Sequence, residues 1–494
     1  NFLLKISQIN YRYFNKKILF IKIGDDLPNS CLINPPWDYI NKILKITTFQ
    51  YIPKNYTNIN IYNEQRPSFF KRVLLGGWET VIYRILIKLN KKIFYKKKSI
   101  IIANENEIII ELVASLFLKG YKINDFRSIK LDNSCSQIKN VKKLKKQIYP
   151  ILRKRLNYWV KNDFINICEK YFYEELLQRV NYYSKWKFTF RNIFKDIGRK
   201  DNYKVFALAN HPSSPKGLAL KNACNYFNIL LCSCQHGVTA ELSASHDYCL
   251  SQHDSSSSDV YLAFNPGSAK VGKLNPFKTA KSLVYGAPKR YNRTKYNLFF
   301  KNKYEILYLS NNLFAGNISG LSVWADDLEK AKTEITILNL LNKINKKVFY
   351  KPYPEINKRY YESNPCLQEA NELENINIIK NNYDARYYLN ESNLLICPSA
   401  SSTVSWALMS EIPTIFINFK NIAPLNIEAY SAFKKGIFLF DYDDKKFSNH
   451  LTAFLNKSLK EINSLWNKKR FQRQKLINSF ISGEKENNIN KIFF

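Results

Sequence analysis

The sequence predicts an α/β protein made of two doubly wound parallel-sheet domains that face a cleft, with a helical insertion in the first. Short apolar runs alternate with helix-length segments in both halves of the chain, which is the pattern of a parallel sheet with crossover helices. The length of 494 residues exceeds what one compact core accommodates. Polar loops follow several of the apolar runs, at the strand ends where open α/β sheets place their ligands.

The first half contains a βαβ unit. Its first strand is expected at residues 99–103, its helix at 107–119 with Gly120 as the stop signal, and its second strand at 121–123. A helix is expected within residues 73–90, after Gly76 and Gly77. Further strands are expected at residues 17–23, 46–52, 204–210, 228–234, 259–264 and 282–286.

Residues 126–200 differ in character, because they are rich in lysine and aromatic residues and follow a helical period. We expect a helical insertion. Its basic, aromatic face suits a membrane surface, and it equally suits a helix with one side in the core and the other in water.

The second half repeats the alternation in a cleaner form. Strands are expected at residues 305–310, 346–351, 375–380, 393–398, 414–418 and 437–441, followed by a largely helical segment at 445–482. A polar stretch after Arg290 is expected to be a linker. We therefore expect a first domain of residues 1–290, a second domain of residues 300–482, and a tail of residues 483–494.

The composition gives a net charge of +36, from 76 Lys and Arg against 40 Asp and Glu. Such an excess favours anionic partners such as nucleic acid, anionic lipids or phosphorylated substrates. The charge is spread along the chain, and Lys, Asn and Ile are abundant throughout, so a compositional bias explains it as well. No RRM, KH, zinc-finger or helix-turn-helix signature appears, and we expect no specific nucleic-acid partner.

Nine cysteines at irregular spacing do not form a disulfide framework, and they indicate a reducing compartment. No apolar run approaches the ~20 residues that span a bilayer. We expect a cytoplasmic protein, with peripheral contact to the inner face of an anionic cytoplasmic membrane as a further possibility.

The densest group of reactive residues lies in residues 230–258, which hold three of the five histidines. Gln235, His236 and Gly237 follow a predicted strand there, and His211 follows the preceding one. A zinc site is the alternative for this stretch; its candidate ligands are Cys232, Cys234, His236, His246, Cys249 and His253. The spacing C-x-C-x-H matches no usual zinc motif. The run of residues 254–259, DSSSSD, suits a mobile polar loop.

Other polar residues follow predicted strands elsewhere. The loop of residues 398–403, PSASST, leaves a strand and enters a helix, so it suits either phosphate binding or ordinary helix capping. Further candidates in the second half are Ser310, Asn311, Asn312, Lys351, Pro352, Tyr353 and Pro354. In the first half Glu105 lies at the end of a strand, where it could bind a ligand or complement a helix dipole, as could Asn104 and Glu107.

The phrases KPYPE (residues 351–355) and NLLICPSASSTVSWALMSEIPTIFIN (residues 393–418), together with the order of elements, resemble the donor-binding domain of GT-B glycosyltransferases. The resemblance extends to bacterial capsule and lipopolysaccharide transferases and to CDP-glycerol glycerophosphotransferases. In the first half, QHG (residues 235–237) and residues 103–121 resemble putative surface-carbohydrate transferases. The sequence departs from the pattern at Tyr353, where these enzymes usually have His, and at Ser405 and Trp406, where a carboxylate often follows.

The resemblance implies two Rossmann-like domains and transfer of a sugar or polyol phosphate from a nucleotide-activated donor to a surface glycan or lipid-linked acceptor. It makes His236 the general base, with His211 assisting, and lets Gly237 admit a ligand close to the backbone. Lys351, Ser401, Ser402 and Thr403 would hold the leaving phosphates, so neither a metal nor a cofactor is expected. The candidate catalytic residues are His236, His211, Gln235 and Glu105. The candidate binding residues are Gly237, Ser310, Asn311, Asn312, Lys351, Pro352, Tyr353, Pro354, Ser399, Ser401, Ser402 and Thr403. The alternatives are a basic nucleic-acid- or membrane-binding protein without catalysis, and a zinc-dependent enzyme.

Overall fold

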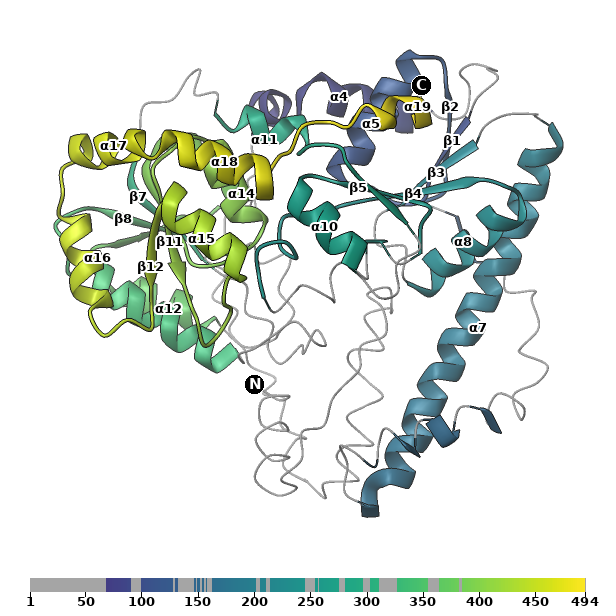
Figure 1. Cartoon of the computed structure of the whole chain (residues 1–494), viewed down its shortest axis with the longest axis horizontal. Coiled ribbons are helices and arrows are strands. Elements are labelled where there is room, and N and C mark those ends of the chain that lie inside the picture. The colour runs from purple at the N-terminus through teal and green to yellow at the C-terminus, as the bar shows by residue number, and fades with distance from the viewer. Residues whose placement is uncertain are drawn as a thin grey trace.

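The computed structural model describes residues 68–89, 99–127, 129–131, 162–200, 205–209, 214–244, 254–255, 257–274, 280–295, 303–310, 327–353, 364–381 and 384–493, and single positions between 146 and 157. The strands expected at residues 17–23 and 46–52 lie outside this part of the chain. The other predicted strands are all present, in two parallel six-stranded sheets with helices around them (Figure 1). The predicted fold class, two Rossmann-like doubly wound domains, is confirmed.

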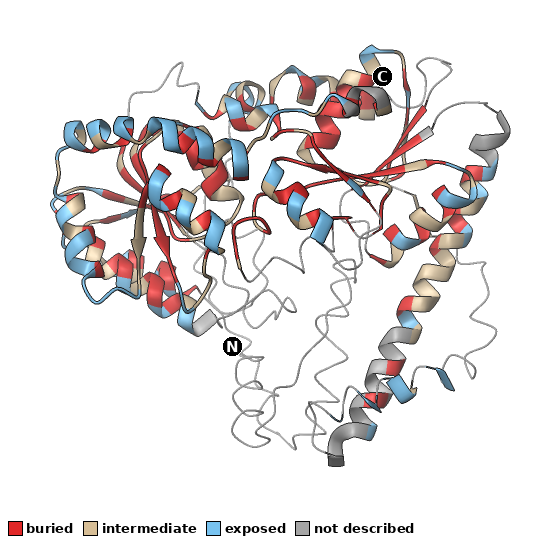
Figure 2. Cartoon of the chain, in the orientation of Figure 1, coloured by how far each residue is buried: buried red, intermediate tan, exposed pale blue. Residues whose placement is uncertain are grey.

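The first sheet has the strand order β2-β1-β3-β4-β5-β6. Its strands are β1 (Ser99–Ile102), β2 (Lys122–Asp125), β3 (Val205–Ala209), β4 (Leu230–Cys234), β5 (Val260–Ala263) and β6 (Lys281–Val284). All neighbouring pairs are parallel. β1 and β5 are buried along their whole length, because helices cover both faces of a parallel sheet (Figure 2).

The helices of this half are α4 (Phe69–Leu89), α5 (Glu107–Leu118), α7 (Asn162–Lys200), α8 (Pro215–Tyr226), α10 (Pro266–Leu274) and α11 (Lys289–Arg293). α7 is a single helix of 39 residues within the expected insertion, and it packs on α8 (Figure 1). α11 occupies the start of the stretch expected to be a polar linker. Its Tyr291 is only 2% exposed, so this connection is part of the packed structure.

The second sheet has the order β12-β11-β10-β7-β8-β9. Its strands are β7 (Tyr304–Leu309), β8 (Val348–Lys351), β9 (Ile376–Ile378), β10 (Ser392–Cys397), β11 (Thr414–Asn418) and β12 (Phe438–Asp441). Its helices are α12 (Asp327–Leu341), α13 (Pro365–Glu372), α14 (Ser402–Met409), α15 (Ile427–Gly436), α16 (Phe447–Leu455), α17 (Leu459–Lys468) and α18 (Arg470–Phe480), with 3₁₀ turns η4 (Ala385–Tyr387) and η5 (Leu389–Glu391).

The C-terminal segment returns to the first sheet. After α18 the chain crosses over and ends in α19 (Asn488–Phe493), beside α5 (Figure 1). Gly483 N–H donates to Phe264 O at 2.9 Å, and Tyr121 Oη–H donates to Phe493 O at 2.8 Å. Gly483 and Phe493, in the expected tail, thus contact the first half.

The strand orders identify the point in each sheet where the chain stops adding strands on one side and continues on the other. In the second sheet the chain starts at β7 and later returns to β10 on its other side, and in the first sheet β1 and β3 are neighbours in the same way. Ligands of doubly wound sheets bind outside the carboxyl ends of strands at such points. The loops after β1, β3, β7 and β10 are therefore where a ligand is expected.

No helix in the described part of the chain combines the length and the apolar character needed to cross a membrane.

Candidate active site

The loop after β4 begins with Gln235, which is buried at 2% exposure. Its amide nitrogen donates to Gly237 O and to Glu241 Oε1, both at 2.8 Å, and its amide oxygen accepts from Phe264 N–H at 2.7 Å. Glu241 also accepts from Asn265 Nδ2 at 2.8 Å. Burial raises the pKa of Glu241, against the opposing effect of these hydrogen bonds. Gln235 was a candidate catalytic residue, but its hydrogen bonds and burial give it the role of holding the loop in shape.

The residues after this loop dock on the second half. Asn426 Nδ2 donates to Glu241 O at 2.7 Å, and Asn426 N–H donates to Leu242 O at 2.8 Å. Ala244 N–H donates to Pro424 O at 3.0 Å. The loop that carries His236 is thus held against the segment that follows β11.

His236 lies at the edge of this loop, with its side chain 31% exposed. Its Nδ1 is 3.2 Å from Oδ2 of Asp254, whose side chain is only 5% exposed. Asp254 belongs to the stretch expected to be a mobile polar loop. That expectation is wrong for the residues described, because Ser255, Ser257 and Ser258 are also buried. A carboxylate that binds one imidazole nitrogen fixes the ring and its tautomer, which is how a histidine base is oriented.

The loop after β10 faces the histidine loop. Ser401 is the N-cap of α14 and accepts from Thr403 N–H, and its hydroxyl is 3.2 Å from that of Ser399. A Cβ atom added to Gly237 would overlap Oγ of Ser402. Only glycine fits at position 237 with Ser402 in this place. The structure therefore brings together two loops, one from each half, whose residues Gly237 and Ser402 are 165 positions apart in the sequence.

Lys351 is buried and hydrogen-bonded within the second half, so its ammonium is not accessible to a phosphate. It is 2% exposed, its ammonium donates to Pro352 O at 2.7 Å, and it lies 5.9 Å from the ring centroid of Tyr388. Burial lowers the pKa of Lys351 to about 8, although the charge of Asp384 opposes the shift. The prediction that Lys351 meets phosphate does not fit this arrangement, because the strand end that carries it is covered.

Ser310 is also engaged in the core of the second half. Its hydroxyl donates to Glu334 Oε1 at 2.5 Å and accepts from Tyr350 Oη at 2.9 Å. Pro352 is buried, while Tyr353 is 37% exposed. The remaining predicted site residues, His211, Asn311, Asn312 and Pro354, lie outside the described residues.

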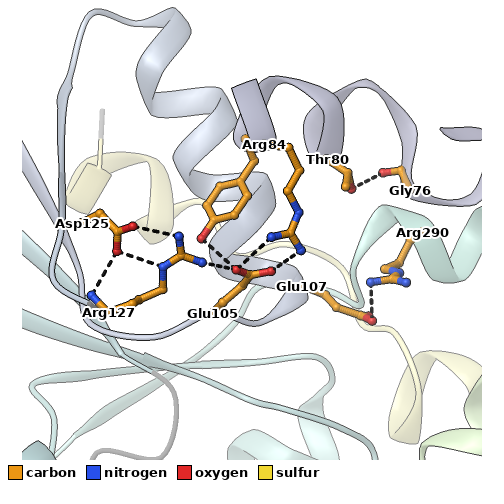
Figure 3. Close-up of polar contacts among 9 residues, drawn as sticks. Gly76, Thr80, Arg84, Glu105, Glu107, Asp125, Arg127 and Arg290 are labelled. Carbon is orange, nitrogen blue, oxygen red and sulfur yellow. Dashed lines mark hydrogen bonds and ion pairs between the residues drawn. The ribbon is translucent and has the colours of Figure 1, made fainter. Parts of the chain in front are cut away.

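Glu105 and Glu107 lie at the start of α5, at the carboxyl end of β1 (Figure 3). Glu105 accepts from Arg84 at 2.6 Å and also pairs with Arg127, which in turn pairs with Asp125 at 2.8 Å. Two guanidinium groups pair with Glu105, so an ion-pairing role within the first half fits it better than a catalytic one.

Glu107 faces the other way, toward α11 (Figure 3). Its Oε1 accepts a hydrogen bond from Arg386 at 2.7 Å and pairs with Arg290 at the same distance. Burial lowers the pKa of Arg290 despite the attraction of Glu107, and Arg386 adds to the decrease. Burial also opposes the charge of Arg386, but the carboxylates of Asp384 and Glu107 outweigh it and raise its pKa. This group joins the first half, the α11 connection and the second half.

Sequence reasoning missed the roles of Arg290 and Arg386. Both belong to segments that leave strands, since Arg290 follows β6 and Arg386 follows β9, so the rule that selected the other candidates could have selected them. Trp406, noted as a departure from the glycosyltransferase pattern, packs under Arg386 with its ring centroid 4.9 Å from the guanidinium carbon.

The structure describes some of the candidate ligands of the alternative zinc site. Cys232 and Cys234 are fully buried in the sheet core, and burial raises the pKa of both thiols. His246, Cys249 and His253 lie outside the described residues. Among the residues described, no group of three His, Cys, Asp or Glu side chains is arranged to hold a metal.

Neither a family model nor a curated protein sequence matches the chain. Solved structures with a similar fold include sucrose-phosphate synthase from Thermosynechococcus elongatus, with 10% identity and a TM-score of 0.41 over 78% of this chain and 95% of that one. UDP-GlcNAc 2-epimerase from Methanocaldococcus jannaschii gives 14% identity and a TM-score of 0.39, covering 74% and 94%. MurG from Acinetobacter baumannii gives 10% identity and a TM-score of 0.38, covering 77% and 98%. These values are too low to assign a substrate or a residue's role to this chain.

Proposed function

We propose that this protein is a GT-B-type glycosyltransferase, which moves a sugar or polyol phosphate from a nucleotide-activated donor to a glycan or lipid-linked acceptor. The observation that carries the proposal is the contact between Gly237 and Ser402. It brings the residue that follows His236 against the N-terminal end of α14, a helix that follows a strand of a doubly wound sheet. A base and a phosphate-binding element at one cleft are what transfer from a nucleotide donor needs. The phrases QHG and PSASST support the same class.

The first half, residues 1–290, would bind the acceptor, and the second, residues 300–482, the donor. In this mechanism His236 donates its Nδ1–H to Asp254, so that Nε2 is the proton acceptor of the neutral imidazole. The acceptor hydroxyl loses its proton to Nε2 as its oxygen bonds to the transferred group. The bond from that group to the nucleotide phosphate breaks, and the phosphate leaves with the electron pair.

The N-terminal end of α14 would stabilise the leaving phosphate. Its first backbone N–H groups and the hydroxyls of Ser401, Ser402 and Thr403 are donors, and the helix dipole favours negative charge there. The basic residues of segment 126–200 would approach an anionic acceptor or membrane surface.

The test is titration calorimetry of the full chain with UDP, CDP, CMP and GDP, followed by nucleotide release from the matching sugar or polyol donors. We expect one nucleotide to bind, with affinity reduced about tenfold in Ser402→Ala because a hydroxyl donor to the phosphate is lost. His236→Ala should bind that nucleotide normally and lose turnover. The proposal is wrong if none of the four nucleotides binds, and salt-sensitive binding of RNA in their place would favour the basic binding protein.

A further inference from the structure

Three charged side chains meet between the two halves at Glu107, and we call them the Glu107 triad: Glu107, Arg290 and Arg386. One carboxylate oxygen, Oε1, accepts a hydrogen bond from Arg386 at 2.7 Å and forms an ion pair with Arg290, also at 2.7 Å. Arg386 also pairs with Asp384 at 2.8 Å. The three side chains are between 17% and 20% exposed, so the group is mostly covered but retains a path to solvent.

The hydrogen bonding of this triad is incomplete. Among the residues described, Oε2 of Glu107 and Nε of both Arg290 and Arg386 are buried without a hydrogen-bond partner. A buried donor or acceptor without a partner is destabilising, and native structures keep few of them. Arg290 thus meets Glu107 through one terminal nitrogen, and Arg386 divides its two terminal nitrogens between Glu107 and Asp384. Neither arginine binds one oxyanion through two parallel hydrogen bonds, as a guanidinium can.

The triad adjoins the candidate active site. Asn106, which precedes Glu107 and caps α5, donates from Nδ2 to Gln235 O at 3.2 Å. On the other side, Arg386 packs on Trp406. Trp406 and Ser402 are four residues apart on α14, so they lie one turn from each other on the same face, roughly 6 Å along the axis. The triad therefore lies beside the loop that carries His236 and beside α14, whose N-terminal end is the proposed phosphate site.

We propose that Arg290 and Arg386 bind the phosphates of the nucleotide donor or leaving group, and that Glu107 is a resident carboxylate which the incoming phosphates displace. A phosphate group offers more acceptor oxygens and more negative charge than Glu107, so it can bond both Nε–H groups that the carboxylate leaves without partners. The N-terminal end of α5, a helix of 12 residues, adds a favourable dipole. This inference rests on the proposed function. It assigns Arg290 and Arg386, and not the buried Lys351, as the cations that bind the phosphates of the donor.

Displacement has a consequence that distinguishes it from a purely structural ion cluster. Because Glu107 competes with the ligand for the same two cations, removing its charge should strengthen phosphate binding. In a structural cluster the same change would weaken the arrangement of the arginines and leave binding unchanged or weaker.

The experiment is calorimetric titration of the full chain with inorganic pyrophosphate at low salt. Glu107→Gln should bind about fivefold tighter or better than the unchanged protein, and Arg290→Gln and Arg386→Gln about tenfold weaker or worse. The matched control is Glu428→Gln. It removes a different pair between the two halves, Lys270–Glu428 at 2.5 Å, whose side chains are 57% and 62% exposed, and it should leave the affinity unchanged.

Thermal unfolding of each variant checks that it is folded. If a Gln variant of either arginine is not, Arg386→Lys keeps the charge and removes the planar fork, and it should still weaken pyrophosphate binding several-fold. Equal or weaker binding in Glu107→Gln, or an affinity that does not depend on either arginine, overturns the inference.

The two proposals fail in different ways. Nucleotide binding and turnover that require His236, with no effect of the triad variants on pyrophosphate affinity, would refute the triad site alone. A pyrophosphate response that follows the triad, without binding of any of the four nucleotides, would refute the transferase and leave an anion site of another kind.

Discussion

Glu105 and Glu107 are two residues apart at the same end of α5, yet they connect different parts of the molecule. The arginines of Glu105 are Arg84 and Arg127, both within the first half. Those of Glu107 are Arg290, on the α11 connection, and Arg386, in the second half. Identical side chains at one helix end thus differ in role because of where their partners lie. We expect contacts within one half to affect stability, and contacts between the halves to affect ligand binding and turnover. Substitutions should separate the two.

The largest effect is expected on the cleft side, at His236. His236→Ala removes the proton acceptor, so turnover should fall about 10²–10⁴-fold, while the unfolding temperature changes little because the side chain is 31% exposed. Initial rates of nucleotide release at saturating donor measure this. A variant that keeps more than a tenth of the activity would contradict the role of His236.

Asp254 gives the internal control for this prediction. Asp254→Asn should lower turnover less than His236→Ala, and it should have no further effect when His236 is already Ala, because Asp254 acts through that ring. Additive losses in the double variant would show that Asp254 works independently.

The next effect is expected within the first half, at Glu111. Burial raises its pKa to about 7, and its Oε1 accepts from Lys289 N–H at 2.6 Å. The unfolded chain loses this proton near the ordinary value of 4.5, so between these pH values the folded protein holds more protons and its stability falls as pH rises. Glu111→Gln keeps an acceptor oxygen without the charge. It should be more stable than the unchanged protein by roughly 3 kcal/mol at pH 8, and similar in stability near pH 4.5.

Urea unfolding of both proteins from pH 5 to 8 measures this difference. Glu79, 1% exposed and paired with Arg293 and Lys289, is the control of opposite sign. Burial alone would raise its pKa, but these partners lower it, so Glu79→Gln should lose stability mainly above pH 4.5. A Glu111→Gln advantage that does not grow with pH would show that Glu111 is charged in the folded state.

Substitutions of two glycines should have smaller effects, one where the two halves meet and one in the interior of the first half. Gly237→Ala places a Cβ against Ser402 across the cleft, whereas Gly272→Ala places one 2.7 Å from Ser282 Oγ and 3.1 Å from the Tyr261 ring within one core. Gly272→Ala should reduce stability by about 1–3 kcal/mol and leave turnover at saturating donor unchanged. Gly237→Ala should reduce turnover about tenfold, with little loss of stability. The comparison fails if both glycines affect the same property.

The smallest effect is expected at Arg84, the more exposed partner of Glu105. Its side chain is 56% exposed, and Arg127 still pairs with Glu105 when Arg84 is replaced. Arg84→Gln should reduce the free energy of unfolding by less than about 1 kcal/mol, and this loss should disappear at high salt. Pyrophosphate affinity should stay unchanged. A large loss of pyrophosphate affinity in this variant would mean that Glu105 and Glu107 act as one anion site.

Sequence reasoning predicted most of the strands and helices, which depend on local patterns. The strand and helix positions followed from periodicity and from stop signals such as Gly120, because those patterns depend on neighbours a few residues apart. The same reasoning selected the loops after β4 and β10, since polar residues that leave an apolar run are visible in the chain itself. It could not tell an accessible residue from a covered one. Gln235 and Lys351 both follow strands, yet both are buried.

The sequence by itself therefore determined the two sheets, their helices, and the two polar loops that carry QHG and PSASST. Only the tertiary structure decided that Gly237 meets Ser402, that Asp254 orients His236, and that Glu107 reaches Arg386, 279 positions away. The reason is physical. Local elements follow from short-range hydrogen bonding and periodic burial, whereas these partners become neighbours only when two sheets pack and the C-terminal segment returns to the first.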